Sequence, residues 1–296
     1  MMKLIDESDI EHLNKRISAS KQESGGSAAN TIAGLASLGN NVAFIGKVKD
    51  DLLGRSFEKG LSDLGVLYCT RRAAEGSPTA CCIVLSTPDA QRTMNTFLGI
   101  SGTLAVEDID EKIISDSKII YLEGYLWDSD NARKAFLKAI ELAGKSSGEV
   151  ALTLSDSFCV ERHRDEFIEL LEKHTDILFA NEDEIKMLFQ VSTFEDAAKC
   201  CRDYKTVFAL TRGEAGSVII EGSRQYLIEP ERNIEVLDTT GAGDMYAAGF
   251  LHGYINNKKL DICGRIGNLT AAAVLPHFGA RPGISLSDIL KRSGYK

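Results

Sequence analysis

Residues 238–244 read Asp-Thr-Thr-Gly-Ala-Gly-Asp, and this stretch is the strongest indication of the fold. A strand-like run from Ile234 to Leu237 precedes it, and a helix is predicted to follow from Met245 to Tyr254. Small residues at a strand-to-helix turn let backbone amides point at one spot, where the helix dipole adds its positive end. The stretch therefore predicts an anion-binding turn with Asp244 in the first turn of a helix.

Two interpretations of Asp244 follow from its position. In the first, its carboxylate meets both a bound hydroxyl and the phosphorus that this hydroxyl attacks, so that it acts as a base. In the second, it only complements the dipole near the helix N-terminus. A single Gly-Asp pair does not choose between them.

A second glycine-rich segment, residues 24–30, reads Ser-Gly-Gly-Ser-Ala-Ala-Asn and opens a helix predicted from Ala28 to Leu38. Two glycines before a helix are by themselves an ordinary tight turn. Glycine also allows close backbone approach, and the carboxamide of Asn30 both donates and accepts hydrogen bonds, as binding of a polyol requires.

Taken together with residues 44–54, these segments resemble the two signatures of the ribokinase-like (PfkB) family of sugar and nucleoside kinases. The resemblance extends over residues 24 to about 285. It implies a three-layer α/β fold with a mostly parallel sheet, and transfer of the γ-phosphate of ATP, with Mg²⁺, to a hydroxyl of a sugar or nucleoside. Residues 92–96 and 121–126, and Gly-Gly-Ser in place of Gly-Gly-Lys, are most similar to bacterial adenosine kinase-like sequences.

The resemblance implies catalytic roles within the first segment and acceptor contacts elsewhere. Asp244 is expected to be the base, and Gly241, Ala242 and Gly243 are expected to form the catalytic turn with it. The amides of Ala242, Gly243 and Asp244 are expected to hold the phosphoryl group. The expected acceptor contacts are Gly25, Gly26, Asn30, Arg92 and Glu123. An arginine on a lid strand has the alternative of being a solvated surface charge.

Nucleotide and metal contacts are implied in the C-terminal half. Asn181 and Glu184 match an N-x-x-E element that orders Mg²⁺ through water, although Asn181 would equally serve as a helix N-cap. Thr211, Gly213 and Gly216 match a T-x-G-x-x-G turn beneath the nucleotide, which alone would be an ordinary hairpin.

A helix of small residues near the C-terminus matches the wall of the family's adenine pocket, with Asn268 and Ala272 near the base. Close packing between helices would produce the same composition. The resemblance also implies a K⁺-type monovalent cation, which Asp238 and the backbone around Gly279 would hold.

The order of predicted elements divides the chain into two parts. From residue 116 onward β-rich runs alternate with helical stretches, which predicts βαβ units and a parallel sheet. Residues 67–100 instead contain consecutive strand-like runs, predicted as a small antiparallel sheet acting as a lid. We therefore expect a large domain of residues 24–66 and 101–296, and a lid of residues 1–23 and 67–100. Family lids often pair, which makes a homodimer through the lid one expected assembly.

The amino-acid composition limits the classes of binding partner that are expected. With 34 Lys and Arg against 43 Asp and Glu, the net charge is -9, so no attraction to nucleic acid or to an anionic membrane is expected. The seven cysteines form no CxxC pair and fit reduced thiols, and no segment approaches the length of a membrane helix. A cytoplasmic protein that acts on a small molecule is expected.

One departure from the family pattern concerns the start of the chain. Family members normally begin with a strand carrying a G-N-x-x-x-D segment, whose Asp grips acceptor hydroxyls, and residues 1–24 lack it. The sequence is therefore expected to be shortened at its start and to bind acceptor weakly, and Asp6 is no convincing substitute. The alternative function is an inactive nucleoside- or sugar-binding pseudokinase. A nicotinamide dehydrogenase and a P-loop enzyme are disfavoured, because neither Gly-x-Gly-x-x-Gly nor Gly-x-x-x-x-Gly-Lys-Ser/Thr is present.

Overall fold

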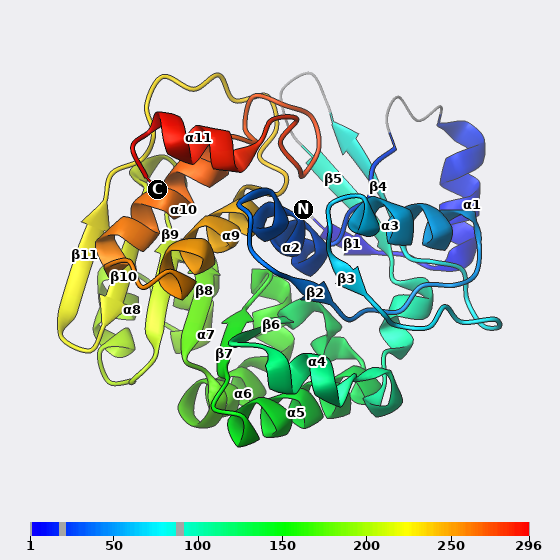
Figure 1. Cartoon of the computed structure of the whole chain (residues 1–296), viewed down its shortest axis with the longest axis horizontal. Coiled ribbons are helices and arrows are strands. Elements are labelled where there is room, and N and C mark those ends of the chain that lie inside the picture. The colour runs from blue at the N-terminus through cyan, green and yellow to red at the C-terminus, as the bar shows by residue number, and fades with distance from the viewer. Residues whose placement is uncertain (1, 18–21, 87–91, 296) are drawn as a thin grey trace.

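A six-stranded sheet forms the centre of the computed structural model, which describes residues 2–17, 22–86 and 92–295 (Figure 1). In chain order its strands are β6 (Ile119–Glu123), β7 (Glu149–Thr153), β8 (Ile177–Asn181), β9 (Val207–Thr211), β10 (Ser217–Glu221) and β11 (Arg224–Ile228). Strands β6 to β9 are parallel neighbours, and β10 and β11 extend the sheet in antiparallel fashion. The mostly parallel sheet predicted from residue 116 onward is confirmed.

Alternation of side chains explains why both faces of this sheet are covered. In β8, Ile177 and Phe179 belong to one hydrophobic cluster, whereas Leu178 and Ala180 belong to another on the opposite face. Burial on both faces gives the parallel strands their continuous apolar sequences.

Helices form the two outer layers (Figure 1). One face carries α4 (Glu111–Asp116), α5 (Asp130–Lys145), α6 (Ser157–His174), α7 (Glu182–Phe189) and α8 (Phe194–Cys201). The other face carries α2 (Ser27–Ser37), α9 (Ala242–Ile255) and α10 (Leu260–Ala272), with α11 (Leu286–Arg292) packed outside them. Short 3-10 turns are η1 (Gly99–Thr103), η2 (Val106–Asp108), η3 (Gly124–Asp128) and η4 (Gly213–Ala215). None of the helices within the described ranges is long and apolar enough to span a bilayer.

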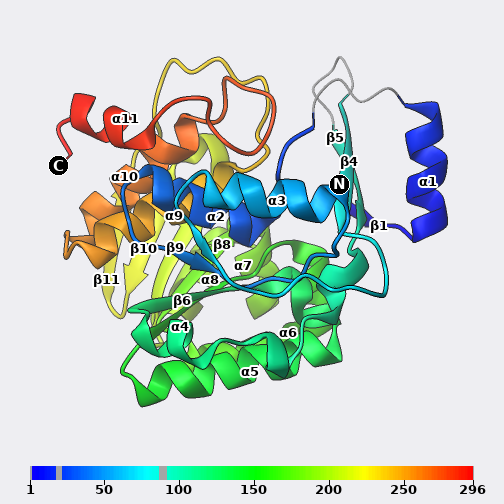
Figure 2. The same ribbon diagram turned by 45° about the vertical axis from the view of Figure 1, so that its right-hand side comes forward.

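A separate three-stranded sheet, which is the predicted lid, stands apart from the central sheet, with α1 (Glu7–Arg16) beside it (Figure 2). It consists of β1 (Met2–Leu4), β4 (Cys81–Ser86) and β5 (Arg92–Phe97). Strands β4 and β5 are antiparallel, as predicted, whereas β1 lies parallel to β5. Asp6 accepts a hydrogen bond from the N–H of Asp9 and caps α1, so its side chain is used locally.

Two strand predictions are wrong. Leu67 and Tyr68 form β3 (Leu67–Tyr68), which pairs in parallel with β2 (Ala43–Phe44) and not with the lid, because α3 (Leu52–Ser62) provides the crossover that parallel pairing needs. Residues 234–237 form no strand. Their position is fixed by single backbone bonds, such as that from the N–H of Leu237 to the carbonyl of Leu275.

Helices α2 and α9 pack in unusually close contact and run in the same direction. A Cβ atom added to Gly34 would lie 2.7 Å from the Cβ of Ala248. Four residues further along α9, and just beyond the C-terminal end of α2, Nδ2 of Asn40 lies 2.9 Å from Nδ1 of His252. Since the contacts advance in the same direction along both segments, the two helix N-termini lie at the same end.

We expect Gly34→Ala to destabilise the protein by about 1–3 kcal/mol, because the added methyl group forces α2 and α9 apart. Adding Ala248→Gly should relieve that clash, so the double variant should lose less stability than the sum of the single changes. Urea unfolding of the four proteins measures this coupling.

Gly144→Ala is the matched control. Gly144 lies in α5 with no atom within 4 Å of an added Cβ, so this change should stabilise the helix slightly. Additive effects at positions 34 and 248, or equal losses at 34 and 144, would contradict close packing as the cause.

Candidate active site

Asp244 lies where the N-termini of α2 and α9 meet. The hydroxyl of Ser27 donates to its Oδ1 at 2.6 Å, and Nδ2 of Asn30 donates to its Oδ2 at 2.9 Å. The structure thus brings together Asn30 and Asp244, which are far apart in the sequence and which the motifs assigned to one site. Two helix N-termini pointing at the same place make it favourable for negative charge.

The turn before α9 has the backbone geometry expected of an anion-binding turn. Gly241 adopts a left-handed conformation with φ of 78°, and a Cβ there would lie 2.4 Å from the carbonyl oxygen of Ala280. Only glycine therefore fits. The N–H groups of Ala242, Gly243 and Asp244 are in the first turn of the helix and so have no acceptor four residues back in the helix. That of Ala242 donates to Thr239 at 3.2 Å.

The electrostatics of Asp244 suit a proton acceptor. Burial raises the pKa of its carboxyl to about 6, against the opposing effects of the hydrogen bonds from Ser27 and Asn30 and of the charge of Arg281. A base with a pKa near the working pH is mainly ionised yet still able to hold a proton.

Glu123, at the carboxyl end of β6, lies close to this centre but is already engaged. Its Oε2 accepts the backbone N–H of Ala28 at 2.7 Å and so caps the first turn of α2. Burial raises the pKa of Glu123 to about 7, and the charge of Asp244 contributes. Its predicted contact with the acceptor stays a prediction beside this observed capping contact.

The remaining residues that are predicted to contact the acceptor lie at the entry to α2 and on the sheet of β1, β4 and β5. Gly26 is the N-cap of α2 with φ of 97°, and an added Cβ on Gly25 would have no atom within 4 Å. Open space therefore adjoins Gly25. Arg92 begins β5, and its side chain lies outside the described part of the structure, so its contact with the acceptor stays a prediction.

Asn181 and Glu184 form a reciprocal cap at the start of α7. The N–H of Asn181 donates to Oε2 of Glu184 at 2.9 Å, while Oδ1 of Asn181 accepts the N–H of Glu184 at 2.9 Å. The helix-capping alternative for Asn181 is therefore confirmed. Glu184 is 5% exposed, and burial, with the nearby charge of Asp156, raises its pKa to about 7.

Glu184 and Asp156 together suit a magnesium ion that keeps most of its water ligands. The described residues contain no group of three or more His, Cys, Asp or Glu side chains arranged to hold a metal. Mg²⁺ commonly keeps several waters and takes one or two carboxylates together with substrate phosphates. Glu184 and Asp156 suit that role, in which the protein supplies a minority of the ligands.

Thr211, Gly213 and Gly216 lie at the carboxyl end of β9, in the tight connection to β10. Gly216 has φ of 81°, and a Cβ there would lie 2.1 Å from the carbonyl oxygen of Ile228. The hairpin alternative describes this geometry correctly. Nε of Arg212 donates to Glu182 at 2.8 Å, which holds the turn against α7.

Asn268 and Asp238 both make contacts that hold loops in place. Nδ2 of Asn268 donates to the carbonyl of Glu229 at 2.8 Å, and Ala272 lies buried one turn further along α10. Oδ2 of Asp238 accepts the N–H of Gly279 at 2.9 Å, which ties the anion-binding turn to the last loop. The adenine wall and the monovalent cation site remain predictions.

Two site residues were not identified from the sequence. Ser27 lies inside the quoted glycine-rich segment, so its position next to Gly26 was an available signal. Arg281 carries no local signal, yet its Nε donates to Oδ1 of Asn30 at 3.1 Å. This bond orients the amide so that Nδ2 faces Asp244.

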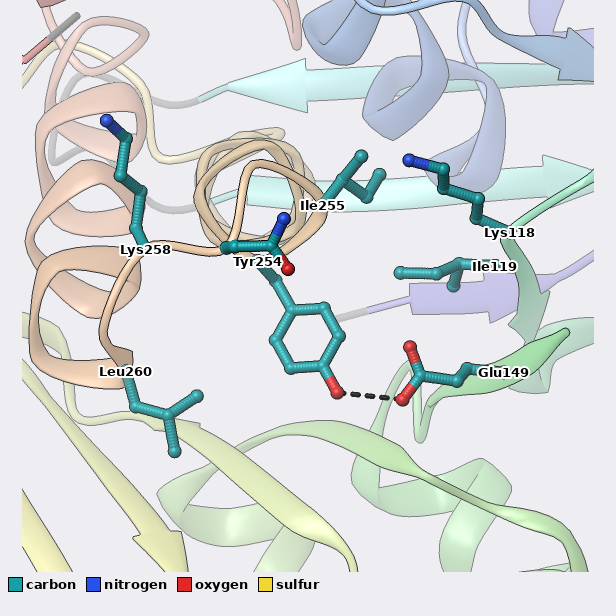
Figure 3. A pocket seen from close by; sticks show the side chains of 8 residues that line it. Lys118, Ile119, Glu149, Tyr254, Ile255, Lys258 and Leu260 are labelled. Atoms are coloured by element: carbon teal, nitrogen blue, oxygen red, sulfur yellow. Dashed lines mark hydrogen bonds between the residues drawn. The ribbon is translucent and has the colours of Figure 1, made fainter.

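A hollow of about 500 Å³ lies away from all of these residues (Figure 3). It is lined by Lys118, Ile119, Glu149, Tyr254, Ile255, Asn257, Lys258 and Leu260. Tyr254 donates to Glu149 across it at 2.8 Å. Ten residues of helix separate Tyr254 from Asp244, which is about 15 Å. The hollow is lined by the amino ends of β6 and β7, whereas the candidate active site lies at the carboxyl end of β6.

Comparison with known proteins gives consistent matches. Residues 1–286 match the family described as pfkB family carbohydrate kinase. An uncharacterized sugar kinase of Archaeoglobus fulgidus is 31% identical over 86% of this chain and 99% of its own length. A 5-dehydro-2-deoxygluconokinase of Listeria monocytogenes is 27% identical over 90% of this chain and 85% of its own length. The crystal structure of adenosine kinase from Sinorhizobium meliloti superposes with a TM-score of 0.96 and 40% identity, covering 99% of this chain and 90% of that one.

The raised pKa of Asp244 predicts a pH dependence of stability. The folded protein keeps this proton up to about pH 6, whereas the unfolded chain releases it near pH 3.8. The stabilisation from this group is therefore fully present below pH 3.8 and is lost as the pH rises through about 6. Asp244→Asn, which does not titrate, should gain about 1–3 kcal/mol relative to the unsubstituted protein between about pH 4 and pH 7.

Urea unfolding across this pH range measures the difference. Asp196→Asn is the control, because Lys199 lowers the pKa of this exposed acid and its contribution has the opposite sign. A stability difference at position 244 that does not change with pH would show that Asp244 titrates normally.

Proposed function

The chain belongs to the pfkB family of carbohydrate kinases and is a phosphotransferase that acts on an alcohol group, and we propose that it phosphorylates an adenosine-like nucleoside with Asp244 as the base. The observation that carries the proposal is the carboxylate of Asp244 between two helix N-termini, with a hydroxyl donating to it at 2.6 Å. That hydroxyl belongs to Ser27, and in the proposed complex the acceptor hydroxyl donates to the same carboxylate.

The transfer proceeds as a single displacement. The acceptor oxygen forms a bond to the γ-phosphorus of ATP, and the bond from that phosphorus to the β–γ bridging oxygen breaks, its electron pair leaving with ADP. The acceptor's proton passes to a carboxylate oxygen of Asp244. The N–H groups of Ala242, Gly243 and Asp244 then hold the phosphoryl oxygens, so that positioning and charge stabilisation supply most of the catalysis.

Support for an adenosine-like acceptor comes from the 40% identical adenosine kinase and from the open space beside Gly25. Relatives named as sugar kinases and as a 5-dehydro-2-deoxygluconokinase make a sugar the second acceptor class. Both classes present vicinal hydroxyls, which the amide of Asn30 and the backbone at Gly25 and Gly26 suit.

ATP is the expected phosphate donor for this family. In the proposed arrangement it lies over β8 and β9, near Thr211 and Gly213, with its adenine against Asn268 and Ala272. Glu184 and Asp156 would hold Mg²⁺, which would supply positive charge beside the phosphate oxygens. The sheet of β1, β4 and β5 closes over the acceptor and excludes water. We also propose that a monovalent cation binds beside Asp238. Two copies of the chain are proposed to pair through their lids, and the protein is proposed to be cytoplasmic.

Asp244→Asn should lower kcat by about 10²–10⁴-fold, because the acceptor hydroxyl loses its base. The Kd for ATP should change little, since the amide N–H groups of the turn are retained. Initial rates of ADP formation and calorimetric titration with ATP measure the two quantities. Full turnover in this variant would remove Asp244 from the chemistry.

The acceptor is identified by ADP formation with adenosine, other nucleosides, ribose, fructose and fructose phosphates. The highest kcat/KM is expected for adenosine. A higher kcat/KM for a sugar would show that the acceptor is a sugar, and the proposed mechanism would stand unchanged. Nucleotide binding without turnover on any of these acceptors would favour the inactive binding protein.

A further inference from the structure

The loop that follows α10 reaches the active site through backbone contacts. The N–H of Gly279 donates to Asp238, and the backbone of Ala280 packs so closely on Gly241 that no Cβ fits there. These contacts place the next residue, Arg281, beside the centre formed by Asn30 and Asp244.

The guanidinium of Arg281 is only partly satisfied. Its Nε donates to Asn30, but its buried Nη2 has no hydrogen-bond partner among the described residues. Two other buried side-chain atoms share that condition, in Ser217 and Tyr246, and these two groups face each other. Arg281 differs from them, because its unpaired Nη2 belongs to a charged group.

A buried, unpaired donor on a charged group is costly unless a ligand satisfies it. Burial lowers the pKa of Arg281, while the charges of Glu23 and Asp244 oppose this and favour the charged form. Arg281 is thus a cation beside the base, at the turn whose amides face the expected phosphoryl group. Arginine forms strong, directional hydrogen bonds to phosphate oxygens.

We propose that Arg281 is a further catalytic residue, whose Nη2 binds an oxygen of the phosphoryl group during transfer while its Nε holds Asn30 in the orientation that donates to Asp244. This inference rests on the proposed kinase function and assigns a cation to the developing charge. It also explains why the site contains a buried arginine whose Nη2 has no hydrogen-bond partner among the described residues.

The polar and charged groups that face Asp244 determine its pKa. They are Ser27 and Asn30 on α2, Glu123, Tyr121 and Tyr125 on or just after β6, and Arg281 on the last loop. Arg281 is the cation that lowers the pKa of Asp244. Removing its charge should therefore move the acid limb of the pH dependence of kcat/KM to higher pH.

The test compares Arg281→Met, which keeps the length but removes the charge and donors, with Arg281→Lys, which keeps the charge. Arg281→Met should lower kcat by about 10²–10³-fold, the effect of removing one preorganised donor, and should shift the acid limb upward. Arg281→Lys should restore part of kcat and leave the acid limb in place. Arg224→Gln, an exposed arginine at the opposite edge of the sheet, is the control and should match the unsubstituted protein.

Binding of ADP with aluminium fluoride and acceptor provides a readout independent of turnover. Its affinity should fall in Arg281→Met in parallel with kcat, while the affinity for ADP alone stays within about threefold. Unchanged kcat, or equal losses for ADP and its aluminium fluoride complex, would overturn the role in transfer.

Stability separates this role from a structural one. Arg281→Met removes the bond from Nε to Asn30 as well as the unpaired Nη2, so the urea midpoint is measured beside kcat in both Arg281 variants. A loss of kcat that only follows a loss of stability would overturn the assignment. If the unsubstituted protein turns over an acceptor and Arg281→Met does so equally well, this inference alone fails. If the unsubstituted protein turns over none, the proposed function fails and this inference with it.

Discussion

The close, same-direction packing of α2 and α9 is the constraint on which the site depends. Gly34 and Ala248 have side chains small enough to let the helix backbones approach, and the same register places Ser27 and Asn30 against Asp244. Two helix N-termini then converge on one carboxylate and on the amides of one turn. Their fields favour the anionic groups that phosphoryl transfer brings together, and they act without any reorganisation at the moment of reaction.

The same convergence explains the unusual charge state of the centre. Asp244, Glu123 and Glu184 are three carboxyl groups whose burial raises the pKa into the range of about 6 to 7. Each accepts hydrogen bonds from backbone N–H, side-chain amide or hydroxyl groups. The pKa values of such carboxyl groups depend strongly on the charge of bound phosphate and metal, so ligand binding is expected to change their protonation.

Several residues that the motifs assign to ligands also hold the protein together. Glu123 caps α2, Asn181 and Glu184 cap α7, Asn268 holds the segment after β11, and Asp238 joins two loops. Capping and ligand binding use the same chemistry, since helix termini and strand ends expose unpaired N–H and C=O groups at the edge where ligands bind. A substitution at these positions therefore changes both local structure and binding. At Arg281, by contrast, Nη2 makes no hydrogen bond within the described protein and is available to a ligand.

The resemblance to the kinase family implied that Asn30 and Asp244 share one site. The sequence by itself determined the α/β class, the parallel sheet from residue 116 onward and the glycine turn before α9. These follow from local signals, because side-chain periodicity, glycine at positive φ and helix-capping residues act within a few positions. Only the tertiary structure decided that Leu67 and Tyr68 pair with β2, that residues 234–237 form no strand, that Glu123 caps α2 and that Arg281 reaches Asn30. Those outcomes depend on which partner a strand or a charged side chain meets across the fold, and contacts between distant segments are set by packing of whole elements, which no short stretch of sequence encodes.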